Sequence, residues 1–199
     1  DVVADTFVQV VHLLQPARTL FQPEIVTRVL AGPRVAPGDA LGPPPPRPRS
    51  IASPVDAMPI PVKERFVEGD AGVRLYAVEA GEGPLVVLVH GFPDFWFSWR
   101  RQLPALAEAG FRAVALDLRG YDRSDKPRGI DAYGARTIAR DLAAVIQNLG
   151  ADRATVVAHD WGGASAWALA MDRSDLVGRL VLMNAPHPAR FREALGDSA

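Results

Sequence analysis

The sequence has 199 residues, 48% of them hydrophobic, which is enough for one domain with a sizeable buried core. Its 22 basic and 23 acidic residues nearly cancel, which excludes the strongly basic surface with which proteins bind nucleic acids or anionic membranes. The absence of cysteine excludes disulfides and thiolate metal sites. The chain also has no apolar run near the roughly 20 residues that cross a bilayer and no N-terminal signal pattern. We therefore expect a soluble, cytoplasmic protein that acts on a small neutral substrate, with neither nucleic acid nor membrane as a partner.

The first 61 residues are rich in proline. They hold 12 of the 18 prolines, including a run of four at 43–46. Proline fixes φ and lacks an amide donor, so such a stretch favours extended polyproline geometry over a packed core. We predict that residues 1–61 form a proline-rich leader that is disordered or only loosely docked. A targeting peptide and a ligand for a proline-binding domain are the alternative interpretations.

The remaining chain alternates strand-like and helix-like segments. Residues 62–67 and 73–79 alternate in polarity around a glycine-containing connection, which is typical of an antiparallel hairpin. Short apolar runs of strand length then alternate with helix-like stretches, which predicts the α/β class with a mostly parallel, doubly wound sheet. The apolar runs are 85–89, 113–116, 154–158 and 180–183, and the helix-like stretches are 97–109, 135–149 and 163–171.

The residues that follow the apolar runs are the candidate site residues, because doubly wound sheets bind ligands beyond the carboxyl ends of their strands. Four such segments combine polar side chains with glycine or proline. They are His-Gly-Phe-Pro at 90–93, Asp-Leu-Arg-Gly-Tyr at 117–121, His-Asp-Trp-Gly-Gly at 159–163 and Asn-Ala-Pro-His-Pro at 184–188.

Asp160 has the sequence context of a nucleophile elbow, the sharp strand-to-helix turn that exposes a catalytic side chain. Ala158 and Gly162, two residues to either side, are small, as the tight turn requires. The turn also points the first amides of the helix at Asp160, which favours a negative charge there. An ordinary helix N-cap is the alternative interpretation of this aspartate.

A carboxylate nucleophile is suited to attack on an sp³ carbon. Attack on an epoxide or an alkyl halide forms an ester that water can hydrolyse at its carbonyl, whereas serine would form a stable ether. Hydrolysis places an oxyanion on the enzyme's own carboxyl group, which needs two aimed amide donors. The backbone amides of Phe92 and Trp161 are the candidates for this oxyanion hole.

Together the four motifs resemble the soluble epoxide hydrolase branch of the α/β-hydrolase family, in order and spacing, from about residue 62 to the end. The resemblance implies that Asp160 is the alkylated nucleophile and that Phe92 and Trp161 supply the oxyanion hole. It also implies that Trp161, Phe92 and Pro93 contact the substrate, and that no metal or other cofactor takes part. Haloalkane dehalogenases use the same nucleophile and are the alternative, although Phe92 stands where their halide-binding asparagine is common. Asp122 stands where the family usually has glycine, so we expect local strain there.

The resemblance also implies parts that this sequence does not contain. The family's catalytic histidine, its orienting acid and its tyrosine-bearing cap all follow the matched segment, and Asn184 occupies an alternative position for the acid. We therefore expect a partial α/β-hydrolase core at 62–185, truncated after about the sixth strand, and the beginning of a cap at 186–199. The open edge of such a sheet would favour association with another chain. Whether the chain is an enzyme is left open, and a non-catalytic fragment is a further alternative.

The histidines are poor candidates for the missing base. His90 is predicted to hold its loop by hydrogen bonds, and His159, directly before the nucleophile, is predicted to pack inside the fold. The four histidines of the chain show no metal-ligand spacing. Asp117 and Arg119 are predicted to stabilise their loop through hydrogen bonds and charge, without a catalytic role.

Overall fold

The structure is a computed structural model that describes residues 7–10, 53–194 and 196, which leaves most of the predicted proline-rich leader outside the described residues. Among the described helices, none has the length and apolar composition of a membrane-crossing segment. The strands are β1 (Phe7–Val10), β2 (Lys63–Glu68), β3 (Arg74–Ala80), β4 (Leu85–Val89), β5 (Arg112–Leu116), β6 (Ala154–His159) and β7 (Val177–Met183). The α-helices are α2 (Gln102–Glu108), α3 (Ala135–Asn148), α4 (Asp160–Asp172) and α5 (Pro188–Ala194). The short 3-10 helices are η2 (Pro54–Ala57), η3 (Asp70–Gly72), η4 (Trp96–Trp99), η5 (Ile130–Tyr133) and η6 (Ser174–Leu176).

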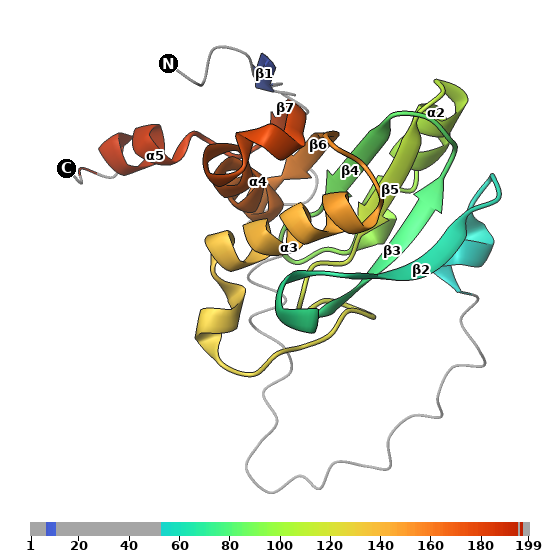
Figure 1. Cartoon of the computed structure of the whole chain (residues 1–199), viewed down its shortest axis with the longest axis horizontal. Helices are drawn as coiled ribbons and strands as arrows, with labels where there is room; N and C mark the ends of the chain where they lie inside the picture. The colour runs from blue at the N-terminus through green and yellow to red at the C-terminus, as the bar shows by residue number, and fades with distance from the viewer. Residues whose placement is uncertain (1–6, 11–52, 195, 197–199) are drawn as a thin grey trace, which may run out of the picture. The chain divides into compact units, whose positions relative to one another are not determined.

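The strands form one mixed sheet in the order β1-β7-β6-β4-β5-β3-β2 (Figure 1). β2 and β3 pair as an antiparallel hairpin in which Lys63 lies opposite Glu79, and β3 also runs antiparallel to β5. The pairs β5–β4, β4–β6 and β6–β7 are parallel. The predicted hairpin and the predicted mostly parallel α/β sheet are therefore confirmed.

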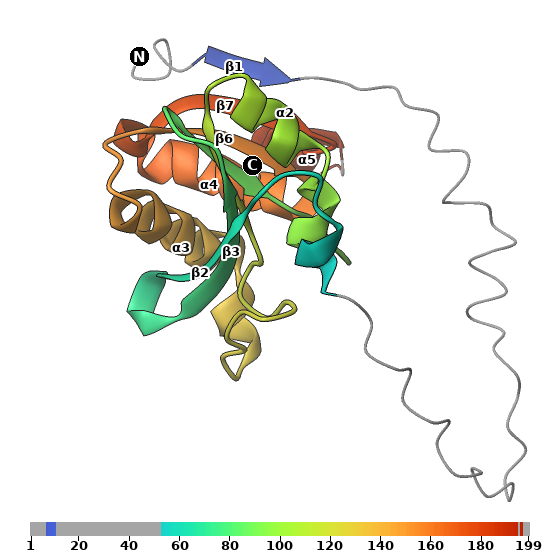
Figure 2. The same ribbon diagram turned by 90° about the vertical axis from the view of Figure 1, so that its right-hand side faces the viewer.

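β4 is buried on both faces, which explains its uninterrupted apolar run. Leu85, Val87 and Val89 belong to the core that includes α3 and α4. The alternate residues Val86 and Leu88 belong to the core that includes α2. Figure 2 shows α3 and α4 on one side of the sheet and α2 on the other. A strand between two helical layers needs an apolar side chain at every position.

Two helices begin at other residues than the sequence predicts. The predicted helix at 97–109 is divided into η4 and α2, because Pro104 has no amide hydrogen and is tolerated only in the first turn of a helix. The helix predicted from Gly163 begins instead at Asp160, so the candidate nucleophile is itself the first helical residue.

The edge of the sheet next to β7 differs from the expectation. β1 pairs with β7 in parallel, with Phe7 opposite Arg179 and Val10 opposite Leu182. The prediction of an open edge at this strand is therefore wrong for the paired residues, because the N-terminal segment supplies the backbone hydrogen-bonding partner. The segment Phe-Val-Gln-Val is rich in the aromatic and β-branched residues that suit a strand.

Candidate active site

Asp160 lies where the chain turns from β6 directly into α4. Its φ is 51°, a left-handed conformation that is uncommon for a residue with a side chain and is often associated with functional turns. Two glycines make the turn sterically feasible. A side-chain carbon at Gly162 would overlap the carbonyl oxygen of His90, and one at Gly163 would overlap Ala185. The tight contacts with neighbouring strand ends therefore explain the glycines at 162 and 163.

The loop after β4 holds the Asp160 carboxylate through its backbone. The Phe92 N–H donates a hydrogen bond to Asp160 Oδ1 at 2.9 Å. A side-chain carbon at Gly91 would lie 2.5 Å from Asp160 Cβ and 2.7 Å from Asp160 Oδ1, so only glycine allows the loop to approach this closely. The Trp161 N–H, the second predicted donor, makes no hydrogen bond to Asp160 in this structure.

A cavity of about 500 Å³ opens beside Asp160. Trp161 borders it, whereas Pro93 and the 64% exposed Phe92 do not. Most of the walls are apolar, and the described residues contribute to them the Asp160 carboxylate, the Asn184 amide and the indole of Trp161 as polar groups. The other residues around the cavity are Ala164, Ala185, Pro186, Pro188 and Phe191. Of the three predicted substrate contacts, the structure thus brings only Trp161 to this cavity.

Asn184, which belongs to one of the four strand-end motifs, borders the cavity, and so does Phe191, which the sequence did not indicate. Asn184 follows β7 as Asp160 follows β6, and the preceding residues His159 and Met183 are register partners. The two residues are therefore neighbours at the strand ends, and Asn184 also has a positive φ, of 54°. The parallel register therefore confirms the placement of Asn184 at a strand end. Phe191 could not be found in this way, because it comes from α5, whose position no strand pairing determines.

His90 is buried and links the loops after β4 and β5. The Leu118 N–H donates to His90 Nε2 at 3.0 Å, and His90 Nδ1 lies 2.8 Å from the carbonyl oxygen of Gly91. Because Nε2 accepts a hydrogen bond, Nδ1 carries the ring hydrogen and donates it to Gly91. Burial lowers the pKa of His90, which favours the neutral ring. The prediction that His90 holds its loop by hydrogen bonds is confirmed.

Asp117 and Arg119 fix the loop after β5, as predicted. Asp117 Oδ1 accepts the Trp96 N–H at 2.8 Å, and burial, with a further contribution from the Asp122 carboxylate, raises the pKa of Asp117 to about 7. Arg119 forms two hydrogen bonds of 2.6 Å with Asp141 on α3, and both side chains of this ion pair are buried. Asp122 has a φ of 32°, in agreement with the local strain expected there.

The other described histidines do not contact Asp160 through hydrogen bonds. His159 is half-buried, and His187 Nδ1 accepts the Ala189 N–H at 3.2 Å while its ring packs edge-on against Trp167. Within the described residues, no group of three His, Asp or Glu side chains is arranged to hold a metal ion. The chemistry of the described site is therefore that of a carboxylate held by one backbone amide, that of Phe92.

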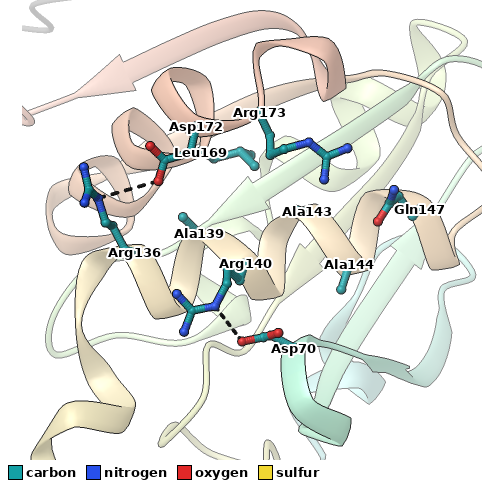
Figure 3. Close-up of a pocket in the computed structure, with 10 residues that line it drawn as sticks. All are labelled: Asp70, Arg136, Ala139, Arg140, Ala143, Ala144, Gln147, Leu169, Asp172 and Arg173. Carbon is teal, nitrogen blue, oxygen red and sulfur yellow. Dashed lines mark hydrogen bonds and ion pairs between the residues drawn. The ribbon is translucent and has the colours of Figure 1, made fainter.

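A second cavity, of about 440 Å³, lies between α3 and the C-terminal end of α4 (Figure 3). Three arginines border it, and each is paired with a carboxylate. The pairs are Arg136 with Asp172 at 3.6 Å, Arg140 with Asp70 at 2.8 Å and Arg173 with Asp175 at 2.7 Å. The floor consists of small or apolar side chains, namely Ala139, Ala143, Ala144 and Leu169.

Comparison with known proteins agrees with this geometry. A family model described as alpha/beta hydrolase fold matches residues 84–196. Epoxide hydrolase 3 of Xenopus tropicalis is 44% identical over 126 residues, which are 62% of this chain and 34% of that protein. The AB hydrolase superfamily protein YfhM of Bacillus subtilis (strain 168) is 46% identical over 129 residues, 64% of this chain and 45% of that protein.

A solved structure of an epoxide hydrolase from an endophytic Streptomyces is also similar, with a TM-score of 0.59 and 50% identity over 61% of this chain and 36% of that one. The chain thus spans less than half the length of each of these relatives. The residues 84–196 that the family model matches include all four strand-end motifs. The chain belongs to the α/β-hydrolase fold family and, within it, to the group that resembles epoxide hydrolases.

Proposed function

We propose that Asp160 is the nucleophile of an epoxide-hydrolase-like site. The observation that carries this proposal is the hydrogen bond from the Phe92 N–H to Asp160 Oδ1, made at a residue with left-handed backbone on the turn between β6 and α4. The bond leaves Asp160 Oδ2 without a hydrogen-bonding partner among the described residues, beside a mainly apolar cavity. A carboxylate in this setting suits a small neutral substrate with an electrophilic sp³ carbon.

The first step of the proposed reaction is alkylation of Asp160. Asp160 Oδ2 attacks a ring carbon of the epoxide, and the bond between that carbon and the ring oxygen breaks. The ring oxygen takes a proton from water, which leaves a hydroxide ion in solution and a hydroxyalkyl ester on Asp160. The Phe92 N–H supports this step by holding the carboxylate in one orientation, which reduces the entropy lost in reaching the reactive geometry.

The second step is hydrolysis of the ester at Asp160 Cγ. Water adds to this carbon and gives up a proton, and the negative charge develops on the carbonyl oxygen. Collapse of the adduct breaks the bond between Cγ and Oδ2, which takes up a proton and leaves with the diol, and the acid that remains loses its proton to the hydroxide formed in the first step, which restores the carboxylate. The amides of Phe92 and Trp161 are the proposed donors to the developing charge. The attacking water needs a general base. None of the described histidines makes a hydrogen bond to Asp160, so we assign to the described residues only the nucleophile and its amide donors.

The proposed substrate is an uncharged epoxide with an apolar substituent. Trp161, Phe191 and the prolines at 186 and 188 offer apolar contacts to such a substituent, and in the described part of the chain no cationic side chain borders the cavity to attract an anion. An alkyl halide would form the same kind of ester, with the halide as leaving group. The experiment below therefore compares an epoxide with an alkyl halide.

Trapping of the ester tests the proposal. The chain is incubated with styrene oxide or, in parallel, with an alkyl bromide of similar size, and the modified residue is located by mass spectrometry of peptides. We expect one substrate molecule to be attached to Asp160, faster with the epoxide, and no attachment in Asp160→Asn. Asp152→Asn is the matched control, because Asp152 is an exposed carboxylate in the turn before β6. Unchanged labelling of Asp160→Asn would refute the proposal, and faster labelling by the bromide would favour the dehalogenase alternative.

A further inference from the structure

We infer that His90 is a positioning residue that sets the direction of the amide donor at Asp160. The inference rests on the proposed function, because it assigns a role to that amide. The Gly91 carbonyl and the Phe92 N–H belong to the same peptide unit, and this unit is bonded on both sides. His90 Nδ1 donates to its oxygen at 2.8 Å, and its N–H donates to Asp160 Oδ1 at 2.9 Å.

The rigidity of the peptide unit couples these two hydrogen bonds. A peptide bond is planar, so a side chain that fixes the direction of the carbonyl also fixes the direction of the N–H. The bond from His90 therefore restricts rotation of the Phe92 amide about the chain. A hydrogen bond accepted by the carbonyl also polarises the amide, which strengthens the hydrogen bond that its N–H donates. His90 thus acts on Asp160 without touching it.

The ring of His90 is itself locked in the required tautomer and orientation. The Leu118 N–H occupies Nε2 at 3.0 Å, so Nδ1 must carry the hydrogen that points at Gly91. Tyr121 packs edge-on against the ring, with centroids 4.7 Å apart, and His90 is only 1% exposed. A continuous path therefore leads from the loop after β5, through one neutral imidazole and one peptide unit, to the nucleophile.

Three substitutions at His90 separate its two hydrogen bonds. In His90→Asn the side-chain NH₂ lies near the position of Nδ1 and can still donate to Gly91. In His90→Gln the longer side chain can still accept from Leu118, and His90→Leu can do neither. We expect the limiting rate of Asp160 alkylation by styrene oxide to fall about 10- to 100-fold in His90→Leu and His90→Gln, and to stay within about threefold in His90→Asn. The half-saturating epoxide concentration should stay unchanged, because His90 does not border the substrate cavity.

Ser124→Ala is the control for a merely structural effect. The buried Ser124 hydroxyl accepts the Tyr76 N–H at 2.8 Å and donates to the Asp117 carbonyl at 2.7 Å, so it also holds the loop after β5 but does not contact Gly91. This variant should have a lower melting temperature and an unchanged alkylation rate. Similar slowing in Ser124→Ala and in His90→Leu would overturn the inference.

Hydrogen exchange of the Phe92 amide gives a second measurement that needs no substrate. We expect exchange to be at least about tenfold faster in His90→Leu, because the amide loses its fixed direction, and unchanged in His90→Asn and Ser124→Ala. Exchange and alkylation that are unaffected in His90→Leu would overturn the inference. If the exchange pattern holds but Asp160 of the unsubstituted chain is never alkylated, only the proposed function fails.

Discussion

The two cavities at the opposite ends of α4 have similar volumes, about 500 and 440 Å³, but different chemistry. In the cavity at Asp160, one carboxylate with left-handed backbone is held by an amide from the loop after β4. In the cavity between α3 and α4, the charged side chains are exposed and already paired with one another (Figure 3). Volume alone therefore does not identify a site. A site is instead recognised by polar groups that the fold holds in fixed positions around a residue with strained backbone.

The difference comes from what lies behind each cavity. The loops at Asp160 are supported by the buried ion pair between Arg119 and Asp141 and by the buried ring of His90. The ion pairs of the other cavity, such as that between Arg140 and Asp70, lie on the helix surface, where water and salt weaken them. Paired charged side chains therefore support the loops around Asp160 in one region, whereas in the α3–α4 region they lie on the surface and contact water.

We expect the largest effect on stability from a substitution that breaks the buried ion pair between Arg119 and Asp141. Arg119→Met leaves the Asp141 carboxylate buried without its cation, although the Asp70 N–H still donates to it. We expect the free energy of unfolding, measured by urea denaturation, to fall by about 3–5 kcal/mol. A loss below about 1 kcal/mol would mean that this pair does not distinguish the region behind Asp160 from the helix surface.

A side chain at Gly91 should disturb the site with less effect on the fold. In Gly91→Ala the new carbon would collide with Asp160, so the Phe92 amide must move away from the carboxylate. We expect alkylation of Asp160 by styrene oxide to slow by about 100-fold. Gly134→Ala is the matched control, because the nearest atom to an added carbon there is 4.0 Å away and the backbone φ is −64°. Equal rates in both variants would show that the close approach at Gly91 is unimportant.

The Asp117 carboxyl makes the stability of the buried loop after β5 depend on pH. Its pKa of about 7 in the folded state lies above its ordinary value of 3.8, so the folded state binds more protons between these two pH values. The free energy of unfolding should therefore decrease as pH rises from about 4 to about 7, by more than about 1 kcal/mol.

Asp117→Asn removes this titration and keeps an oxygen that can accept the Trp96 N–H. Unfolding free energies of both proteins are measured across the same pH range. The lowered pKa of His90 affects both profiles alike, so their difference isolates Asp117. Parallel profiles would contradict the prediction.

We expect the smallest effect on stability from a substitution of an exposed residue at the α3–α4 cavity. In Arg140→Met an exposed arginine loses its ion pair with Asp70 while its apolar stem is largely retained. We expect the free energy of unfolding to change by less than about 0.5 kcal/mol and the alkylation rate to stay the same. A loss comparable to that of Arg119→Met would remove the contrast between the two regions.

The sequence by itself determined the class of the fold and the position of the turn at Asp160. The spacing of hydrophobic residues along the chain is a local property. The hairpin of alternating polarity and the uninterrupted apolar run of Leu85–Val89 could therefore be recognised without a structure. The small residues around Asp160 are likewise a local steric requirement of a sharp turn. Local patterns fail where a contact crosses between segments, which is why the pairing of β1 with β7 and the cavity wall at Phe191 were not predicted.

Only the tertiary structure decided which groups act together at the strand ends. Leu118, His90 and Asp160 come from three different strand ends, and the path between them exists because β5, β4 and β6 lie side by side in the sheet. The same holds for Asp141, which α3 brings to Arg119 from 22 residues away. Hydrogen bonds require distances near 3 Å and fixed directions, and the packing of helices against the sheet sets these distances and directions. Residue type and spacing thus identified Asp160, and the packing of the fold determined how it is held.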